Sequence, residues 1–201
     1  MPIGAVITAD IVNSTLLTPA DEKKLVEMLS LALTPNRYEF YRGDSFQVYI
    51  KEPGQALRIL LQTRTIARKI SPDQDIRASI GIGEVNTHLR KLNTATDEAF
   101  VLSGRSFDIL SQINNRLMIK SSNDIFNHAF TVISHFTDYI FKSLTEKQAE
   151  VFFLLLGNNT QAEVAKKLKK SQSTVNKHIQ SGGWHELAEI LHEYSAIVSK
   201  I

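Results

Sequence analysis

The stretch from Leu144 to Gln180 restricts the possible folds of this 201-residue chain more than any other, because it predicts three short helices in succession. Thr145 and Thr160 each stand three residues before a glutamine or a glutamate, which is the capping-box pattern of a helix N-terminus. Gly157 and the two asparagines after it end the first helix, since both residue types tolerate the left-handed conformation of helix C-termini. Ser171 caps the third helix. The close succession of the second and third helices predicts a helix-turn-helix.

The third predicted helix carries polar side chains on every face except the one that buries Val175 and Ile179. Such side chains can bond the base edges and phosphates of a major groove. The candidates for base contacts are Gln172 and Asn176, and those for phosphate contacts are Lys169, Lys170, Ser173, Thr174 and Lys177. Five lysines and one acidic residue over positions 161–180 give this segment a formal charge of +4, whereas the whole chain carries +2. We therefore predict that the segment binds double-stranded DNA; the alternative is an ordinary helical hairpin that packs on the rest of the protein.

The same stretch resembles the helix-turn-helix of LuxR-type regulators and of region four of sigma factors. The residues that carry the resemblance are Leu144–Glu146, Glu163–Leu168 and Ser173–Val175. Lys169 and Lys170 stand where many repressors have a glycine in the turn. The resemblance implies a DNA-reading module of the kind that transcriptional regulators carry.

The composition narrows the remaining possibilities. Without cysteine the chain cannot form a disulfide, a thiol nucleophile or a zinc–thiolate site, and it suits the reducing cytoplasm, where we expect the protein to be located. The longest apolar run, Val151–Leu156, is too short to span a bilayer, so we expect no membrane partner. A length of 201 residues with 43% hydrophobic side chains allows one mid-sized domain and a small one.

Strand and helix patterns alternate over residues 1–120. Ile3–Val12 is an almost continuous apolar run, as expected of a strand that is buried on both faces. Gly43 and Asp44, between two strand patterns, predict a tight hairpin. The expected elements are the strand Ile3–Val12, the helix Thr18–Leu33, the strands Tyr38–Arg42 and Ser45–Ile50, the helix Pro53–Ile70, the strand Ile76–Ile82, the helix Ala99–Gln112 and the strand Leu117–Lys120. This order predicts an α+β fold with a ferredoxin-like core, extended by one helix and one strand.

We expect three parts in the chain: an α+β domain over residues 1–120, a linking helix within residues 121–142, and a small all-α helix-turn-helix domain over residues 143–201. The linking helix runs from Ser122 to Tyr139. Its apolar residues predict a packed side that consists of Ile125, Phe126, Ala129, Val132, Ile133 and Phe136. The same helix is the candidate contact between two copies of the chain.

Two carboxylates are candidates for a metal site. Asp10 lies toward the end of the first strand, and Asp44 lies in the hairpin turn. In a ferredoxin-like sheet the first strand lies beside that hairpin, so both carboxylates meet at one edge, where they suit Mg²⁺ completed by nucleotide phosphates. The polar loop Asn13, Ser14 and Thr15 precedes a helix N-terminus and is the candidate phosphate-binding segment. The structural alternatives are that Asp44 only forms a tight turn, and that Asp10 is held by another partner in its apolar strand.

These segments resemble the catalytic domain of class III nucleotidyl cyclases. The resemblance rests on Ala9–Thr15, Arg42–Phe46 and Ile80–Glu84, in that order along the chain. It implies that Asp10 and Asp44 ligate Mg²⁺ or Mn²⁺ together with a nucleoside triphosphate, and that Ile11 adds its backbone carbonyl. Arg105 matches the catalytic arginine of the family.

Two positions depart from the cyclase pattern. Val101 stands where the family has its transition-state asparagine, and Phe40 stands roughly where it has the base-recognising lysine. A cyclase-like domain followed by a helix-turn-helix resembles the SatD-like bacterial proteins.

The sequence thus predicts a DNA-binding transcriptional regulator with a degenerate cyclase-like sensor or dimerisation domain. The alternative is an enzyme, a metal-dependent nucleotidyl cyclase or nucleotidyltransferase that carries a DNA-binding domain. A third possibility is that the first domain is only a scaffold for dimerisation. We expect a homodimer in which Arg105 reaches the site of the partner copy, because cyclase-like domains generally pair.

Overall fold

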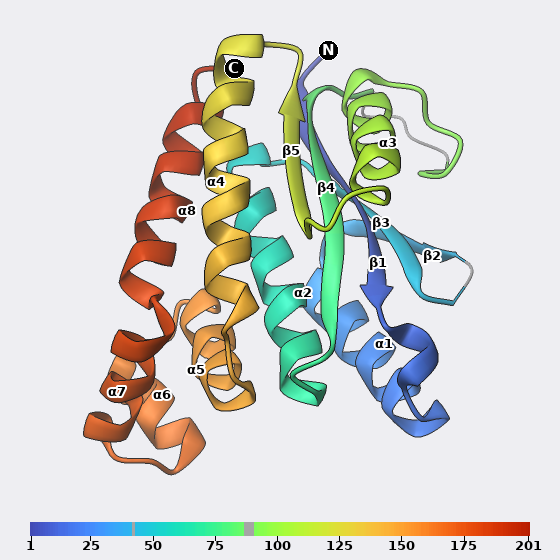
Figure 1. The fold of residues 1–201 in the computed structure, drawn as a ribbon. Helices are drawn as coiled ribbons and strands as arrows, with labels where there is room; N and C mark the ends of the chain where they lie inside the picture. Colours follow the sequence, from blue (N-terminus) through green and yellow to red (C-terminus); the bar gives the residue numbers. More distant parts are fainter. Residues whose placement is uncertain (42, 87–90) are drawn as a thin grey trace.

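The computed structural model describes residues 1–41, 43–86 and 91–201. Its sheet has the strand order β2-β3-β1-β4-β5 (Figure 1). The strands are β1 Ile3–Val12, β2 Arg37–Tyr41, β3 Ser45–Ile50, β4 Asp75–Glu84 and β5 Leu117–Ser121. The predicted end of the second strand, Arg42, lies outside the described residues. The first four strands have the order of a ferredoxin-like sheet, and β5 extends it by parallel pairing with β4.

Helices cover both faces of this sheet, with α1, α2 and α4 on one side and α3 on the other (Figure 1). The helices are α1 Pro19–Leu33, α2 Ala56–Ile70, α3 Glu98–Leu110, α4 Asp124–Lys142, α5 Glu146–Leu156, α6 Gln161–Leu168, α7 Gln172–Gly182 and α8 Trp184–Val198. Two short 3-10 turns, η1 Ser14–Leu16 and η2 Pro53–Gln55, precede α1 and α2. The predicted α+β class is confirmed.

The central strand β1 is antiparallel to both β3 and β4, which confirms its predicted place beside the hairpin. Its alternate residues divide between the two faces. Ala5, Ile7, Ala9 and Ile11 join the large core beneath α1 and α2, and Val6 packs toward α3 with Phe100. Asp10 is four residues after Val6, and alternate residues of a strand point to the same face, so Asp10 faces the α3 side of the sheet.

Helix α3 lies unusually close to β4 at Gly81. A Cβ atom at this glycine would lie 2.2 Å from the carbonyl oxygen of Ala99 and 2.5 Å from the backbone nitrogen of Ser103. Two hydrogen bonds join α3 to the sheet at the same place. The hydroxyl groups of Ser103 and Thr8 are 2.9 Å apart, and the Ser79 hydroxyl donates to the Ser103 carbonyl at 2.6 Å. Gly81 therefore serves a close contact between a helix and a strand.

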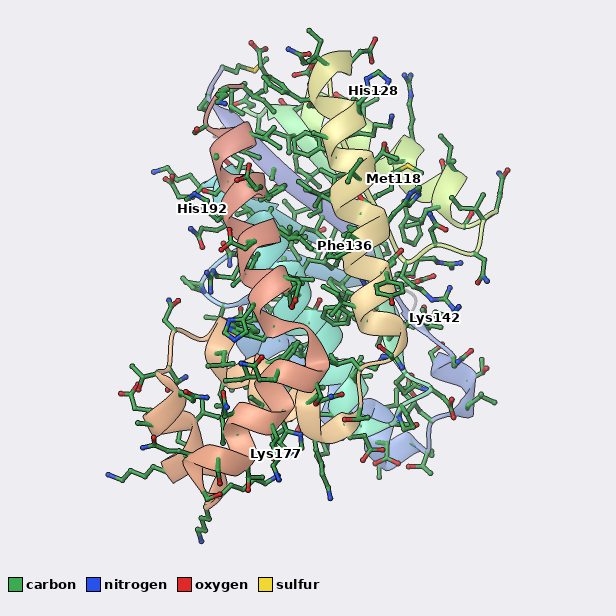
Figure 2. The ribbon with its side chains drawn as sticks, turned by 60° about the vertical axis from the view of Figure 1, so that its left-hand side comes forward. Met118, His128, Phe136, Lys142, Lys177 and His192 are labelled. Carbon is green, nitrogen blue, oxygen red and sulfur yellow. The ribbon has the colours of Figure 1, made fainter. Side chains whose placement is uncertain are left out.

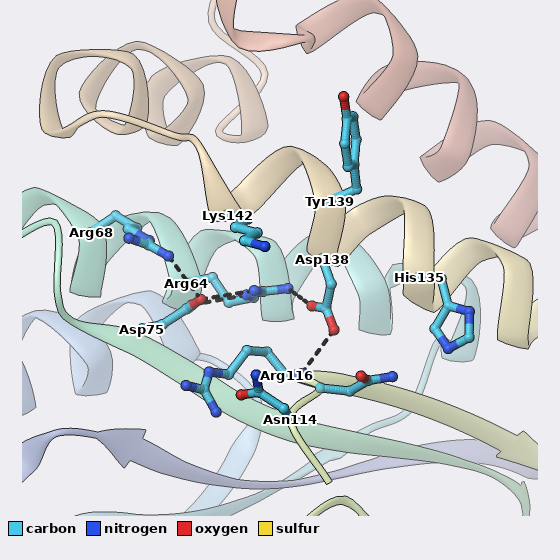
Figure 3. Close-up of a pocket in the computed structure, with 10 residues that line it drawn as sticks. Arg64, Arg68, Asp75, Asn114, Arg116, His135, Asp138, Tyr139 and Lys142 are labelled. Carbon is cyan, nitrogen blue, oxygen red and sulfur yellow. Dashed lines mark hydrogen bonds and ion pairs between the residues drawn. The ribbon is translucent and has the colours of Figure 1, made fainter.

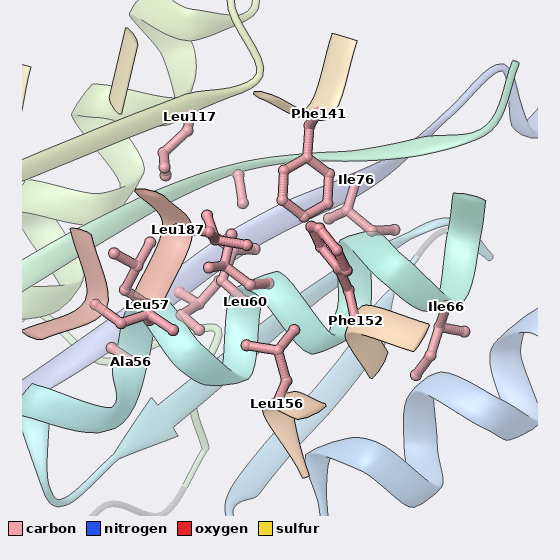
Figure 4. Packing of buried hydrophobic residues seen from close by; sticks show 14 of the residues in the cluster. Ala56, Leu57, Leu60, Ile66, Ile76, Leu117, Phe141, Phe152, Leu156 and Leu187 are labelled. Atoms are coloured by element: carbon pink, nitrogen blue, oxygen red, sulfur yellow. The ribbon is translucent and has the colours of Figure 1, made fainter. Parts of the chain in front are cut away.

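The C-terminal helices pack on α2 and continue the core of the sheet. Phe141, Phe152 and Leu187 meet Leu57 and Leu60 in one cluster of buried side chains (Figure 4). Two hydrogen bonds join the same parts: the Tyr194 hydroxyl donates to the Pro53 carbonyl at 3.0 Å, and Arg58 donates to the Leu156 carbonyl at 3.1 Å. The C-terminal helices are thus fixed to the sheet by a continuous core.

The packed side predicted for the linking helix is wrong at three positions. Ile125 is 79% exposed, Val132 is 68% exposed and Phe136 is 44% exposed, whereas Ile133 is buried as predicted. The buried side of α4 consists of Asn127, Phe130, Ile133, Ser134, Thr137, Ile140 and Phe141. Apolar periodicity failed because this helix has apolar residues on two sides and polar residues on its buried side.

Figure 2 shows α4 and α8 side by side, and the partly exposed Phe136 of α4 lines the groove between them together with Ile190 of α8. Within the described part of the chain, no helix combines the length and the hydropathy that a bilayer-spanning segment requires.

Candidate functional site

Asp10 is bound by an arginine that the sequence analysis did not single out. Asp10 and Arg77 are register partners on β1 and β4, and Arg77 Nε donates to Asp10 Oδ1 at 3.2 Å while Nη2 donates to Oδ2. The guanidinium lies 5.6 Å from the centre of the Phe107 ring on α3. Arg77 therefore neutralises the carboxylate that was predicted to ligate a metal ion. One feature of the sequence could have revealed this partner. Arg77 is a charged residue in the largely apolar strand β4, on the face opposite to Ile76, so it needs an acidic partner there.

The hairpin turn lies next to the end of β1, as predicted. The Ile11 backbone nitrogen donates to the Asp44 carbonyl at 3.0 Å, and Ser45 is the register partner of Asp10. The Ser14 hydroxyl donates to Asp44 Oδ2 at 2.8 Å. The structure thus brings together the backbone of Ile11 and Asp44, the side chain of Ser14 and the position of Asp10.

The remaining two residues of the predicted phosphate-binding loop behave differently. Asn13 adopts a left-handed conformation with φ 58°, and its side-chain amide donates to the Asp73 carbonyl at 2.8 Å. The Gln74 amide in turn donates to the Asn13 carbonyl at 3.1 Å. Asn13 therefore joins the β1–α1 turn to the α2–β4 loop, and Thr15 is exposed in η1. Among the described residues, no group of three or more His, Cys, Asp or Glu side chains is placed to hold a metal ion.

The predicted catalytic arginine lies on the outer side of α3. Arg105 is exposed, whereas Ser103 and Ser106 of the same helix are buried against the sheet. Phe40 packs between Tyr38 and Phe46, with ring centres 6.0 and 5.2 Å away. Phe40 is thus part of an aromatic cluster on the hairpin.

The helices of the predicted DNA-binding segment begin where their capping residues stand. Both capping boxes, at Thr145 and Thr160, form in full. Lys169 takes the left-handed conformation with φ 52°, and the Lys170 nitrogen donates to the Ala165 carbonyl at 3.0 Å. The Ser171 hydroxyl accepts the backbone N–H of Thr174. Three residues, 169–171, therefore form the turn between α6 and α7.

Helix α7 buries only Val175 and Ile179, and its predicted DNA-contacting residues lie around the remaining surface. The exposed ones are Lys169, Gln172, Ser173, Asn176 and Lys177. Lys177 lies at the far end of the molecule in Figure 2.

Four of the predicted DNA-contacting residues have protein partners. One of them is Ser173, whose hydroxyl lies 2.8 Å from the Ser171 hydroxyl. The Asn176 side-chain oxygen accepts a hydrogen bond from Gln161 at 3.3 Å, and the half-buried Thr174 shares the Ser171 hydroxyl at 2.9 Å. Lys170 lies 3.9 Å from a carboxylate oxygen of Glu150. Asn176 thus sits at the contact between α6 and α7, where its orientation is defined.

Comparisons with known proteins give a partial structural likeness. No protein-family model matches the sequence, and no curated protein does. A bacterial light-regulated adenylyl cyclase is a structural neighbour, with a TM-score of 0.38, 13% sequence identity, and coverage of 59% of this chain and 43% of that protein. The chain thus spans less than half the length of that cyclase.

Proposed function

We propose that the protein binds double-stranded DNA through α7 and acts as a transcriptional regulator. The observation that carries this proposal is the division of α7 into a narrow buried side, formed by Val175 and Ile179, and a polar and basic surface that projects from the end of the molecule. A recognition helix needs this division, because its base-reading side chains must enter a groove while its other side stays on the protein.

The surroundings of α7 hold it firmly. The Gln148 side chain of α5 donates to the Ser181 hydroxyl of α7 at 3.0 Å. At Gly182, an added Cβ atom would lie 2.8 Å from the Phe152 ring, so α7 and α5 are in close contact. A rigid support favours DNA reading, since side chains on a fixed helix lose less freedom on binding.

The first prediction separates base reading from charge attraction. We expect Asn176→Ala to weaken binding to a selected DNA site by about 1–3 kcal/mol and to relax its specificity. We expect Lys177→Ala to weaken binding to all sequences alike and to flatten the salt dependence by about one unit of slope. Fluorescence anisotropy over a salt series measures both quantities. Lys200→Ala, an exposed lysine in the C-terminal segment, is the control and should leave both unchanged.

We further propose that two copies pair through α4. Ile125, Val132 and Tyr139 are 79%, 68% and 73% exposed, and their spacing of seven residues aligns them in one stripe. The rings of Phe136 and Tyr139 stack beside the stripe with centres 6.1 Å apart. A symmetric dimer would present two α7 helices to half-sites about one DNA turn apart.

The second prediction tests this pairing. We expect Val132→Glu to convert the dimer into a monomer, because a carboxylate in the middle of an apolar helix contact remains unpaired. Sedimentation velocity measures the change. Thr131→Glu places the same charge on the neighbouring exposed position and should leave the dimer intact. A wild-type protein that is already monomeric at high concentration would contradict the pairing.

A second candidate function is binding of a metal–nucleotide at the end of β1, as in a nucleotidyl cyclase or nucleotidyltransferase. It is favoured by the hydrogen bond from Ile11 to Asp44, which places the hairpin turn beside Asp10. Two carboxylates and a carbonyl match the oxygen ligands of Mg²⁺, which would neutralise phosphate charge there. Arg77 is the competitor, since it already holds both oxygens of Asp10. The oxygen atoms of Asp10, Asp44 and Ile11 therefore fit a metal ion only if the side chain of Arg77 moves away from Asp10.

The third prediction decides between these roles of Asp10. If the site binds nucleotide, calorimetry with Mg²⁺ and each nucleoside triphosphate should show binding that Asp10→Ala weakens by more than about tenfold. Asp108→Ala, an exposed carboxylate on α3, is the control and should bind like the wild type. Equal binding by wild type and Asp10→Ala would leave Asp10 as the structural partner of Arg77 alone.

A further inference from the structure

A basic cavity lies between α2, α4 and the segment that leads into β5, apart from both sites described above (Figure 3). Its volume is about 520 Å³, which falls within the range of small-molecule sites. Four cationic side chains line it, Arg64, Arg68, Arg116 and Lys142, together with two carboxylates, Asp75 and Asp138. Its formal charge, counted over these six residues, is therefore +2.

Both carboxylates of the cavity are fully engaged. Arg64 donates to Asp75 at 2.9 and 2.8 Å and to Asp138 at 2.7 Å. Asp138 also accepts the backbone N–H groups of Arg116 at 2.8 Å and Leu117 at 3.2 Å. Burial by itself lowers the pKa of Arg64, but the two carboxylates outweigh it and hold the pKa above its ordinary value. Arg64 is thus a permanently charged part of the scaffold.

The other three cations retain unused donors. The Nε atom of Arg68 is buried and has no hydrogen-bond partner, although its terminal nitrogens reach the Pro72 carbonyl and Asp75. Arg116 and Lys142 form no ion pair with any residue that the structure describes. A buried donor without a partner costs free energy unless a ligand or water satisfies it. Arg116 is half-buried and Lys142 is exposed, so this cost falls on the Nε atom of Arg68, which points to an anionic ligand in the cavity.

We propose that this cavity binds a small phosphate-bearing molecule, with Arg68, Arg116 and Lys142 as the phosphate-binding residues. Arginine suits this role because its planar donors match phosphate oxygens, and lysine adds a mobile charge. His135 lines the same cavity and offers its ring to the organic part of the ligand (Figure 3). The proposal requires neither DNA binding by α7 nor a metal at Asp10.

Inorganic phosphate is the probe for the first test, used with the full chain. Thermal unfolding over a phosphate titration, at constant ionic strength, measures binding as a rise in Tm. We expect the wild type and the control Lys23→Ala/Lys24→Ala, changed at two exposed lysines of α1, to be stabilised alike. We expect Arg116→Ala/Lys142→Ala to lose the phosphate-dependent rise while keeping a similar Tm without phosphate. The absence of a rise in the wild type, or an equal rise in the double variant, overturns the proposal.

A second arm distinguishes a small ligand from the phosphates of a DNA backbone. Arg116→Ala/Lys142→Ala should leave the salt slope of DNA binding unchanged if the cavity serves a small molecule. A slope that falls by about 1.8, the value for two lost phosphate contacts, combined with no effect of inorganic phosphate, would assign the two cations to DNA and overturn the proposal.

Discussion

Replacing Arg64 with methionine is expected to lower the free energy of unfolding by about 3–5 kcal/mol, the usual effect of removing one partner of a buried ion pair. Arg64 is 1% exposed and is the only described cation that contacts Asp75 and Asp138 together. Its removal leaves these carboxylates largely without the charge that offsets their burial. It also removes the guanidinium that lies 4.3 Å from the centre of the Phe141 ring. Urea denaturation at pH 7 measures the loss.

A triple variant separates the loss of charge balance from the loss of packing. Arg64→Met/Asp75→Asn/Asp138→Asn removes both carboxylates together with the guanidinium. Only Arg68, which is 13% exposed, then loses an ion-pair partner, and we expect the variant to be more stable than Arg64→Met alone. Arg58→Met on the same helix is the matched control. Arg58 is half-buried and donates to Leu156 and Asn158 without an ion pair, so its loss should cost about 0.5–1.5 kcal/mol. A loss for Arg64→Met no larger than this control would show that the network is not a stabilising element.

The second large effect is expected at Gly81. We expect Gly81→Ala to lower the free energy of unfolding by about 3 kcal/mol, at the upper end of the usual range for an overpacked core. The added methyl group would meet the backbone of α3, at the Ala99 oxygen and the Ser103 nitrogen, and backbone cannot move aside as a side chain can. Thermal unfolding followed by circular dichroism measures the loss.

Gly104 provides the matched control on the opposing helix. Apart from its chain neighbours and the backbone of its own helix turn, no atom lies within 4 Å of a Cβ atom added there, and the residue is in the interior of α3. We expect Gly104→Ala to stabilise the protein by about 0.5–1 kcal/mol, because alanine loses less conformational freedom in a helix than glycine does. Effects of the same sign and size at both glycines would contradict the close packing of α3 on β4.

Local rules predicted the parts of this fold that depend on neighbouring residues. The capping boxes at Thr145 and Thr160 were predictable because each is made by residues three positions apart. The hairpin at Gly43 was predictable because turns of this kind are specified by the residues in the turn itself. Once the hairpin was predicted beside the first strand, the position of Asp44 next to Ile11 followed. The exposed side of α4 was not predictable, since the partner that covers a helix face is distant in the sequence.

The charged partners were missed for the same reason. Arg77 is 67 residues from Asp10 in the sequence, and only the register of β1 and β4 shows that they meet. A sequence signal for Arg64 did exist: it follows Leu57, Leu60 and Leu61 on the apolar side of α2, which indicates a buried arginine that needs acidic partners. The identity of those partners required the structure, because Asp138 is 74 residues away.

The salt dependence of DNA binding by the full-length protein tests the central claim most directly. We predict that fragments of genomic DNA bind with an affinity that falls as salt rises, because lysines of α6 and α7 replace counterions on the phosphates. Removing three exposed lysines of this segment, in Lys166→Ala/Lys169→Ala/Lys177→Ala, should flatten the slope by up to about 2.7. The absence of salt-sensitive binding to any fragment, or an unchanged slope in the triple variant, would contradict DNA recognition by α7.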